Sequence, residues 1–197
     1  MNTVLAIPGS LRRASFNRAL LRAAKDLAPP QISVGVYEEL GSIPLFDEDL
    51  EARTSSGPEP VRRLREQVEA ADGLLISTPE YNHSVPGLLK NAIDWLSRPA
   101  PREVLTGKPV AITGASGGPW GTRLAQAALR QILYATECIV LPSPALYLRN
   151  AGTLVDEAGD LTDVATRERL ASFLAAFAAW MARVASSDSS GITAARR

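Results

Sequence analysis

Short apolar runs alternate with helical segments along almost the whole of this 197-residue chain. Four runs are nearly continuous, as in strands that a parallel sheet buries on both faces, and they occupy residues 3–7, 73–77, 109–113 and 138–141. A fifth run, residues 31–37, alternates apolar and polar side chains as an edge strand does. Helices are expected at about 16–28, 58–71, 85–97, 119–135 and 162–185.

Five strands that alternate with five helices predict an α/β protein. We expect a flavodoxin-like three-layer α/β/α fold whose five parallel strands follow the order 2-1-3-4-5. Ligands of such sheets bind beyond the carboxyl ends of the strands, at the reversal between strands 1 and 3, so the loops after these strands should carry the chemistry. Residues 1–185 are expected to form a single domain, and the polar tail 186–197 is expected to be disordered.

The composition excludes several classes of protein. Lys plus Arg and Asp plus Glu balance at 21 each, so the charge favours neither nucleic acid nor an anionic membrane as a partner. The single cysteine, Cys138, rules out an intrachain disulfide, and with one histidine, His83, no metal site is expected. The N-terminus lacks a signal-peptide pattern, and the longest apolar run, 173–182, is too short to span a bilayer. We therefore expect a soluble cytoplasmic protein.

The segment after the first strand, PGSLRRASFN at residues 8–17, combines a glycine, two serines, two arginines and an asparagine before a helix that starts near Phe16. A helix N-terminus with free N–H groups binds anions, and hydroxyl and guanidinium groups complete a phosphate cradle. Neither a Walker A loop nor the dinucleotide fingerprint is present, which favours a terminal monophosphate. The alternative is that Ser15 is only the N-cap of the helix, although position 18 is Arg and not the Glu of a capping box.

The loop after the third strand is bracketed by Pro79 and Pro86. It is either a rigid turn with a helix cap or a platform on which backbone groups of residues 80–84 meet the edge of a flat heteroaromatic ring beside Tyr81. A solvated loop is favoured over catalytic or metal-binding roles for His83 and over Glu80 as a general base. The helix that follows has a broad apolar arc, which indicates a second buried contact such as another subunit: Leu88, Leu89, Ala92, Ile93, Trp95 and Leu96.

Three further features have less specific interpretations. The glycine-rich loop 114–121 either lets the backbone approach a ring or is a flexible turn. The acidic segment 43–51 is interpreted as a solvated loop and not as a metal site built from Asp47, Glu48 and Asp49, with Leu45 and Phe46 available to touch a partner chain. Cys138 is expected to be inert packing in a buried strand.

Together the loops resemble those of the NADPH-dependent FMN reductase family, a flavodoxin-like group that includes bacterial quinone and chromate reductases. The matching segments are GSLRRASFN at 9–17, PEYNHSVPGLLKNAIDWLSR at 79–98 and, more weakly, GASGGPWG at 114–121. The likeness extends from residue 2 to near residue 182, in the same order.

The resemblance implies a site for FMN formed by all three loops. The first loop would bind the phosphate, the second would lie along the isoalloxazine, and the third would border the ring. The implied residues are, in that order, Ser10, Arg12, Ser15, Phe16 and Asn17; Pro79, Glu80, Tyr81 and Asn82; and Ser116 and Gly117. The resemblance also implies a homodimer or homotetramer with the flavin near a subunit interface.

The implied function is that of an NAD(P)H-dependent oxidoreductase. A hydride from NADPH or NADH would pass to bound FMN and then to a small-molecule acceptor such as a quinone, a free flavin or chromate. No catalytic side chain is expected, because the flavin carries the chemistry and the protein binds and orients it. Two alternatives stay open: a flavodoxin-type electron carrier, against which the neutral charge counts, and a flavin-binding regulatory protein without significant turnover.

Overall fold

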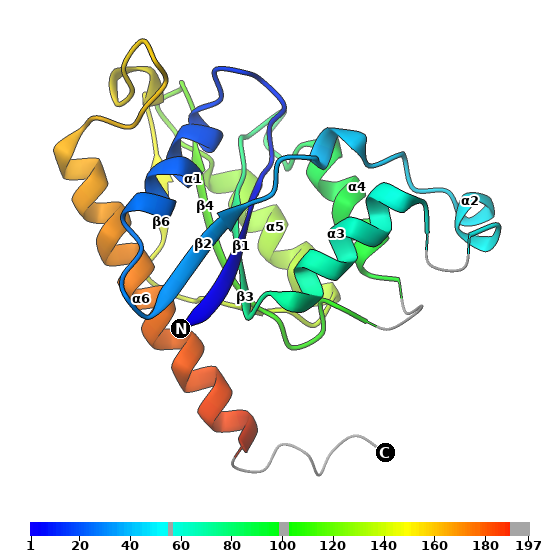
Figure 1. The fold of residues 1–197 in the computed structure, drawn as a ribbon. Coiled ribbons are helices and arrows are strands. Elements are labelled where there is room, and N and C mark those ends of the chain that lie inside the picture. The colour runs from blue at the N-terminus through cyan, green and yellow to red at the C-terminus, as the bar shows by residue number, and fades with distance from the viewer. Residues whose placement is uncertain (55–56, 99–102, 190–197) are drawn as a thin grey trace.

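A parallel sheet forms the middle layer of the structure (Figure 1), a computed structural model that describes residues 1–54, 57–98 and 103–189. Its strands are β1 (Asn2–Pro8), β2 (Ile32–Val36), β3 (Gly73–Ser77), β4 (Pro109–Ala115), β5 (Ile139–Val140) and β6 (Leu146–Leu148). The order β2-β1-β3-β4-β5 confirms the predicted topology, with β6 added on β4. The reversal between β1 and β3 lies where the sequence predicts it.

The edge beside β4 differs from the prediction, because two short strands replace one. β5 pairs with Pro109 and Val110, whereas β6 pairs with residues 113–115 at the other end of β4. The five residues between them include Pro142 and Pro144, which have no N–H to donate to a ladder. The predicted five-stranded sheet is therefore corrected to six strands, with β5 and β6 sharing one edge.

Helices cover both faces of the sheet (Figure 1). On one face lie α1 (Phe16–Asp26) and α6 (Val164–Ser189), and on the other lie α3 (Glu59–Ala70), α4 (Gly87–Leu96) and α5 (Arg123–Ala135). Strand residues alternate between the two cores: Val4 and Ala6 pack on the side of α1 and α6, whereas Leu5 and Ile7 pack on the opposite side. This double burial explains why the strands read as continuous apolar runs.

The five predicted helices are all present, with shifted ends. α5 begins at Arg123 and not at 119, after Gly121 adopts a φ of 70° that a helix does not permit. α6 continues to Ser189, so the first residues of the tail that was expected to be disordered are helical. The rest of that tail, 190–197, lies outside the described residues. Two short 3-10 helices, η1 (Leu40–Ser42) and η2 (Ala151–Thr153), were not predicted.

The interpretation of segment 43–51 as a solvated loop is correct in part: Asp47, Glu48 and Asp49 are exposed, but the segment is not all loop. Its second half opens the short helix α2 (Glu48–Ala52), because the Asp47 carboxylate accepts hydrogen bonds from the N–H groups of Asp49 and Leu50. Phe46 packs edge-on against Trp95 with ring centroids 4.9 Å apart, and Trp95 Nε1 donates to the Pro44 carbonyl over 2.9 Å. Residues of the same chain therefore cover the broad apolar arc of α4, which no longer indicates a second subunit.

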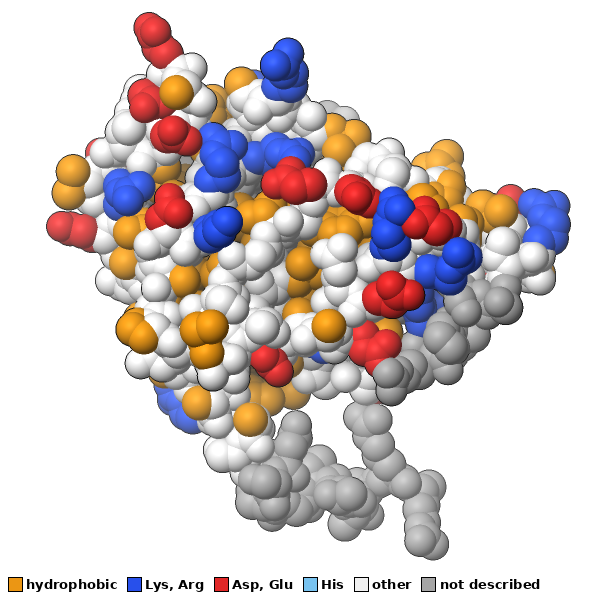
Figure 2. Space-filling model, in the orientation of Figure 1, with side chains coloured by type: hydrophobic (Ala, Val, Ile, Leu, Met, Phe, Trp, Pro, Cys, Tyr) orange, Lys and Arg blue, Asp and Glu red, His pale blue; other side chains and the backbone are white. Residues whose placement is uncertain are grey.

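The surface carries both signs of charge together. Figure 2 shows Lys and Arg side chains interspersed with Asp and Glu side chains on the face seen in Figure 1. Within the described ranges, no helix is both long enough and apolar enough to cross a membrane.

Candidate active site

A cleft of about 230 Å³ lies among the loops that follow β1, β3 and β4. With one exception, Asn82, the residues that the sequence assigned to a cofactor all line it, and Ala115 joins them. The full lining is Ser10, Arg12, Ser15, Phe16, Asn17, Pro79, Glu80, Tyr81, Ala115, Ser116 and Gly117. The fold thus brings together residues that lie as much as about a hundred positions apart, as ligand sites of doubly wound sheets require.

The first loop presents its hydrogen-bonding groups at the start of α1. Ser15 is the N-cap, because its hydroxyl accepts the Arg18 N–H over 3.4 Å. With this cap in place, the backbone N–H groups of Phe16 and Asn17 still have no acceptor inside the helix and can donate to a ligand. The Arg12 guanidinium lies 4.7 Å from the centre of the Phe16 ring, a cation–π distance. A guanidinium, a hydroxyl and a helix N-terminus at one end of the cleft suit an anion.

Ser10 and Asn17 are both buried, but their side chains bond within the protein. The Ser10 hydroxyl accepts the Arg12 N–H over 3.3 Å. The Asn17 amide bonds to Ser77 and Ala115 at the ends of β3 and β4. Asn17 therefore keeps its backbone N–H and the second N–H of Nδ2 to donate, whereas the Ser10 hydroxyl keeps its own proton.

The first and second loops are in direct contact. The Gly9 N–H donates to the Ser77 carbonyl over 2.8 Å, and a Cβ atom on Gly9 would lie 3.1 Å from Pro79 Cδ. A side chain at this position would press against the second loop, which would have to shift by a few tenths of an ångström. The anion end of the cleft is thereby fixed against the second loop.

The second loop ends in a tight hairpin. Tyr81 and Ser84 exchange backbone hydrogen bonds of 3.1 and 3.0 Å, and Asn82 and His83 between them have φ values of 49° and 63°. Positive φ at both central residues is the mark of a type I′ turn. Asn82 lies at its exposed tip and outside the cleft lining, which is where the structure departs from the sequence-based set of site residues.

Glu80 serves as a cap for α5. Its carboxylate accepts the N–H groups of Leu124 and Ala125 over 2.9 and 3.0 Å, while Thr122, at the N-cap position, makes no side-chain capping bond. The other carboxylate oxygen lies 3.6 Å from Nδ1 of the exposed His83. These bonds engage the carboxylate, which leaves Arg12 as the charged group available to a ligand in the cleft.

The third loop is held by β6, a strand that the sequence did not predict. The Ser116 N–H donates to the Leu148 carbonyl over 2.9 Å, and the Ser116 hydroxyl accepts the Gly118 N–H over 3.1 Å. Gly117 faces the Phe16 ring, because a Cβ atom there would lie 3.8 Å from Phe16 Cε2. The third loop therefore closes the cleft against the first.

Other polar groups of the chain lie outside this cleft. Burial raises the pKa of the Cys138 thiol, whose Sγ lies 3.4 Å from the Leu105 carbonyl oxygen. The thiol is therefore protonated, but the expectation of a buried strand position is corrected: Cys138 is half-buried and directly precedes β5. Among the described residues, no group of three or more His, Cys, Asp or Glu side chains is arranged to hold a metal ion.

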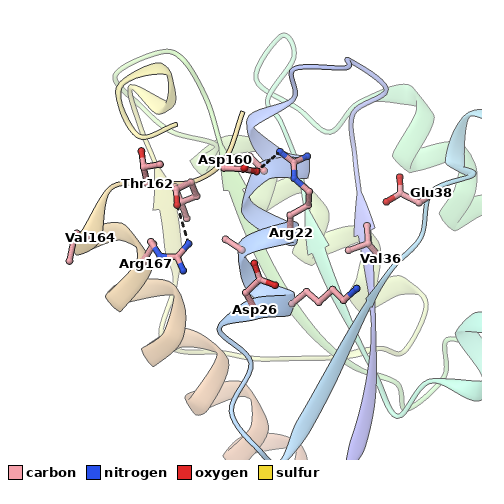
Figure 3. Close-up of a pocket in the computed structure, with 12 residues that line it drawn as sticks. Arg22, Asp26, Val36, Glu38, Asp160, Thr162, Val164 and Arg167 are labelled. Atoms are coloured by element: carbon pink, nitrogen blue, oxygen red, sulfur yellow. Dashed lines mark hydrogen bonds and ion pairs between the residues drawn. The ribbon is translucent and has the colours of Figure 1, made fainter. Parts of the chain in front are cut away.

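A larger hollow of about 810 Å³ lies beside α1, next to the start of α6 (Figure 3). Its arginines are already engaged: Arg22 donates to the Gly159 carbonyl over 2.6 Å and lies 3.3 Å from Asp160, and Arg167 donates to the Leu161 carbonyl over 3.1 Å. Its lining mixes cations with carboxylates and contains none of the loop residues described above. The candidate active site is therefore the smaller cleft.

Comparison with known proteins points to one group. The model of a family described as NADPH-dependent FMN reductase matches residues 2–153. An NAD(P)H-dependent FMN reductase of Pseudomonas aeruginosa is 45% identical over 181 residues, which cover 92% of this chain and 96% of the relative. A 2-hydroxy-1,4-benzoquinone reductase of Burkholderia sp is 40% identical, with 90% and 95% covered.

Solved structures agree with the sequence relatives. FerB, a flavoenzyme NAD(P)H:(acceptor) oxidoreductase from Paracoccus denitrificans, superimposes with a TM-score of 0.83 at 36% identity. The alignment covers 93% of this chain and 98% of FerB. The structural similarity therefore extends over nearly the whole of both chains.

Proposed function

The chain belongs to the NADPH-dependent FMN reductase family, and from this membership we propose that its cleft binds FMN with the phosphate at the N-terminus of α1. The relatives are NAD(P)H-dependent oxidoreductases, and this chain is an oxidoreductase of the same family. In the proposal the isoalloxazine lies between the second and third loops, against the backbone of Pro79, Glu80 and Gly117.

The observation that carries the proposal is the separation of two kinds of surface within one cleft. At one end lie the Arg12 guanidinium, the Ser10 hydroxyl and the first N–H groups of α1, all of which suit a phosphate. At the other end lie backbone segments without a free carboxylate, since Glu80 is engaged by α5. A ligand with one phosphate and one flat heterocycle matches this donor set.

The residues of the chain have binding and orienting roles in this mechanism. Bound FMN would supply the redox chemistry, by taking a hydride from NAD(P)H and passing electrons to an acceptor. Arg12 neutralises the phosphate. Gly9 and Pro79 keep the loop after β1 (the phosphate loop) against Pro79 and Glu80 of the loop after β3 (the ring platform). Within the described ranges, the backbone N–H of Glu80 makes none of the hydrogen bonds found, and it is therefore available to a polar atom at the edge of the ring. No side-chain acid or base is required.

Quinones are the proposed acceptors, with free flavin and chromate as further candidates. The names of several relatives support this choice, including the quinone reductase of Escherichia coli strain K12, which is 41% identical over 182 residues. NADPH is proposed as the preferred donor because the family carries it in its description, with NADH as the alternative. Since these nucleotides are metabolites of the cytoplasm, a cytoplasmic location is part of the proposal.

A homodimer or homotetramer is also proposed. After the exposed Arg123, one face of α5 carries a row of uncharged side chains that are exposed except for the half-buried Ala128: Leu124, Ala127, Ala128, Gln131, Tyr134 and Ala135. Leu124 begins this row beside the cleft, since its N–H bonds to Glu80. Tyr81 and Trp120, in the loops after β3 and β4, are also exposed. An uncharged patch of this kind suits a second copy of the chain.

Anaerobic mixing of the FMN-loaded protein with NADPH tests the proposal and separates its alternatives. The proposal predicts rapid loss of the flavin absorption, followed by turnover when benzoquinone is added. Bound flavin that NADPH and NADH leave oxidised would indicate an electron carrier served by another reductase. Reduction without appreciable turnover on quinones, flavins or chromate would instead indicate a regulatory protein.

A further inference from the structure

The side chain of Asn17 connects all three loops of the cleft. Its Oδ1 accepts hydrogen bonds from the Ser77 hydroxyl over 2.8 Å and from the Ala115 N–H over 2.9 Å. Its Nδ2 donates to the Ala115 carbonyl over 2.9 Å. Asn17 lies in the first turn of α1, whereas Ser77 and Ala115 are the last residues of β3 and β4. One amide thus joins the end of the first loop to the starting points of the second and third loops.

These bonds are buried and use three of the four hydrogen-bonding positions of the amide, which leaves one N–H of Nδ2. Asn17 is 3% exposed, Ala115 3% and Ser77 0%. An amide oxygen accepts two hydrogen bonds, and both are supplied from within the protein. Removal of the Asn17 amide would leave the Ser77 hydroxyl and both backbone groups of Ala115 unsatisfied in a dry interior, which is costly. The loops would have to move to recover those bonds.

Asn17 and Ala115 line the cleft themselves, and all three anchors lie within two residues of other lining residues. Asn17 is two residues from Ser15, Ser77 is two residues from Pro79, and Ala115 precedes Ser116. A shift of any anchor therefore changes the distance between the phosphate end and the ring platform. Binding sites lose affinity when such spacings change by even about 1 Å.

We propose that Asn17 is a positioning residue: its side chain sets the relative placement of the three loops and makes no contact with the ligand. The proposal rests on the proposed function for the identity of the ligand, FMN. It differs from the role that the family resemblance suggested for Asn17, namely a contact with the phosphate.

Asn91 provides a matched control. It is the other buried asparagine of the core, and it makes the same kind of clamp: Oδ1 accepts the Phe46 N–H over 2.7 Å and Nδ2 donates to the Pro44 carbonyl over 2.9 Å. Asn91 lies on α4 and does not line the cleft. Asn17→Ala therefore removes three buried amide bonds at the cleft, and Asn91→Ala removes two bonds of the same kind away from it.

The first measurement is the FMN affinity of the apo proteins by fluorescence quenching. We expect Asn17→Ala to weaken binding by about tenfold or more, and Asn91→Ala by less than about twofold, although both variants should melt at a lower temperature than the wild type. Equal FMN affinities in the two variants would overturn the proposal. Wild-type protein that does not bind FMN would instead overturn the proposed function.

Riboflavin, which lacks the phosphate, distinguishes positioning from direct contact. If Asn17 sets all three loops, Asn17→Ala weakens riboflavin and FMN by similar factors. If its amide binds the phosphate, only FMN binding falls, as expected for Arg12→Ala, and the proposal is overturned.

Ser77→Ala keeps the test decisive if Asn17→Ala does not fold. It removes one of the three bonds from a residue outside the cleft lining, so we expect FMN affinity to fall by about twofold to fivefold. Amide hydrogen exchange of apo Ser77→Ala should accelerate in residues 78–81 and 116–118. Unchanged exchange and unchanged affinity in this variant would contradict the proposal without reference to enzyme activity.

Discussion

The Glu80 carboxylate lies 2.9 Å from the backbone nitrogen of Leu124, so the loop that follows β3 caps the helix that follows β4. Thr122 makes no side-chain capping bond, and the cap of α5 is therefore supplied from 44 residues earlier in the chain. This bond fastens the loop after β3 to the side of the cleft that carries α5.

Glu80→Ala should lower the free energy of unfolding by about 1 kcal/mol, the usual cost of a lost N-cap. Glu80→Gln should lose less, because the amide oxygen still accepts a hydrogen bond. Urea unfolding of the apo protein measures both. Glu66→Ala, an exposed glutamate on α3, is the control and should change stability by less than about 0.5 kcal/mol. A Glu80→Ala protein as stable as this control would contradict the capping role.

Gly114→Ala should destabilise the protein severely. A Cβ atom at this position in β4 would overlap Thr122 Oγ1 and the Thr78 carbonyl oxygen, so the second and third loops would have to separate. Gly87→Ala, at the start of α4, is the matched substitution, since a Cβ atom there meets nothing within 4 Å. Thermal melting should show a large loss for Gly114→Ala and a neutral or small stabilising effect for Gly87→Ala. Similar melting temperatures would show that the loops adapt.

The start of α6 should contribute stability that depends on pH. Hydrogen bonds from the side chain and backbone of Thr166 lower the pKa of Asp163 from its ordinary value of 3.8. A lowered pKa means that this stability is complete above the unfolded-state pKa and is lost as the pH falls through the folded-state pKa. Asp163→Ala should therefore lower the melting temperature at about pH 7 and have a smaller effect at about pH 3. An equal effect at both pH values would exclude a role for the charge.

The uncharged face of α5 predicts an assembly that a charge will disrupt. Ala127→Glu places a carboxylate in the centre of that face and should shift the protein toward monomer in analytical ultracentrifugation. Ala165→Glu, on an exposed position in the first turn of α6 near Glu168 and Arg169, should leave the oligomer unchanged. Identical sedimentation of both variants and the wild type would exclude α5 as the interface.

The sequence predicts the sheet well because burial on both faces makes β1, β3 and β4 nearly continuous apolar runs. It misses β6, because LYL at 146–148 is short and follows two prolines. It also misreads the broad arc of α4: Trp95 and its neighbours contact Phe46 and Pro44, and periodicity within one helix does not reveal such a distant partner.

The loops of the site could be located from their positions after the strands, but the roles of individual side chains could not. Asn17 and Glu80 were both assigned to the cofactor, yet their side chains bond to Ala115 and Leu124. Each partner is distant in the sequence and is brought close only by the strand order. Asn82 follows Tyr81 in the same motif, but the positive φ values of the hairpin place it at the tip.

The most direct test of the account is to denature the purified protein and identify any molecule that it releases, after recording its visible absorption spectrum. The account predicts flavin bands and the release of FMN, or stoichiometric binding of added FMN where the protein is purified without it. A colourless protein that does not bind added FMN would contradict the assignment of the cleft.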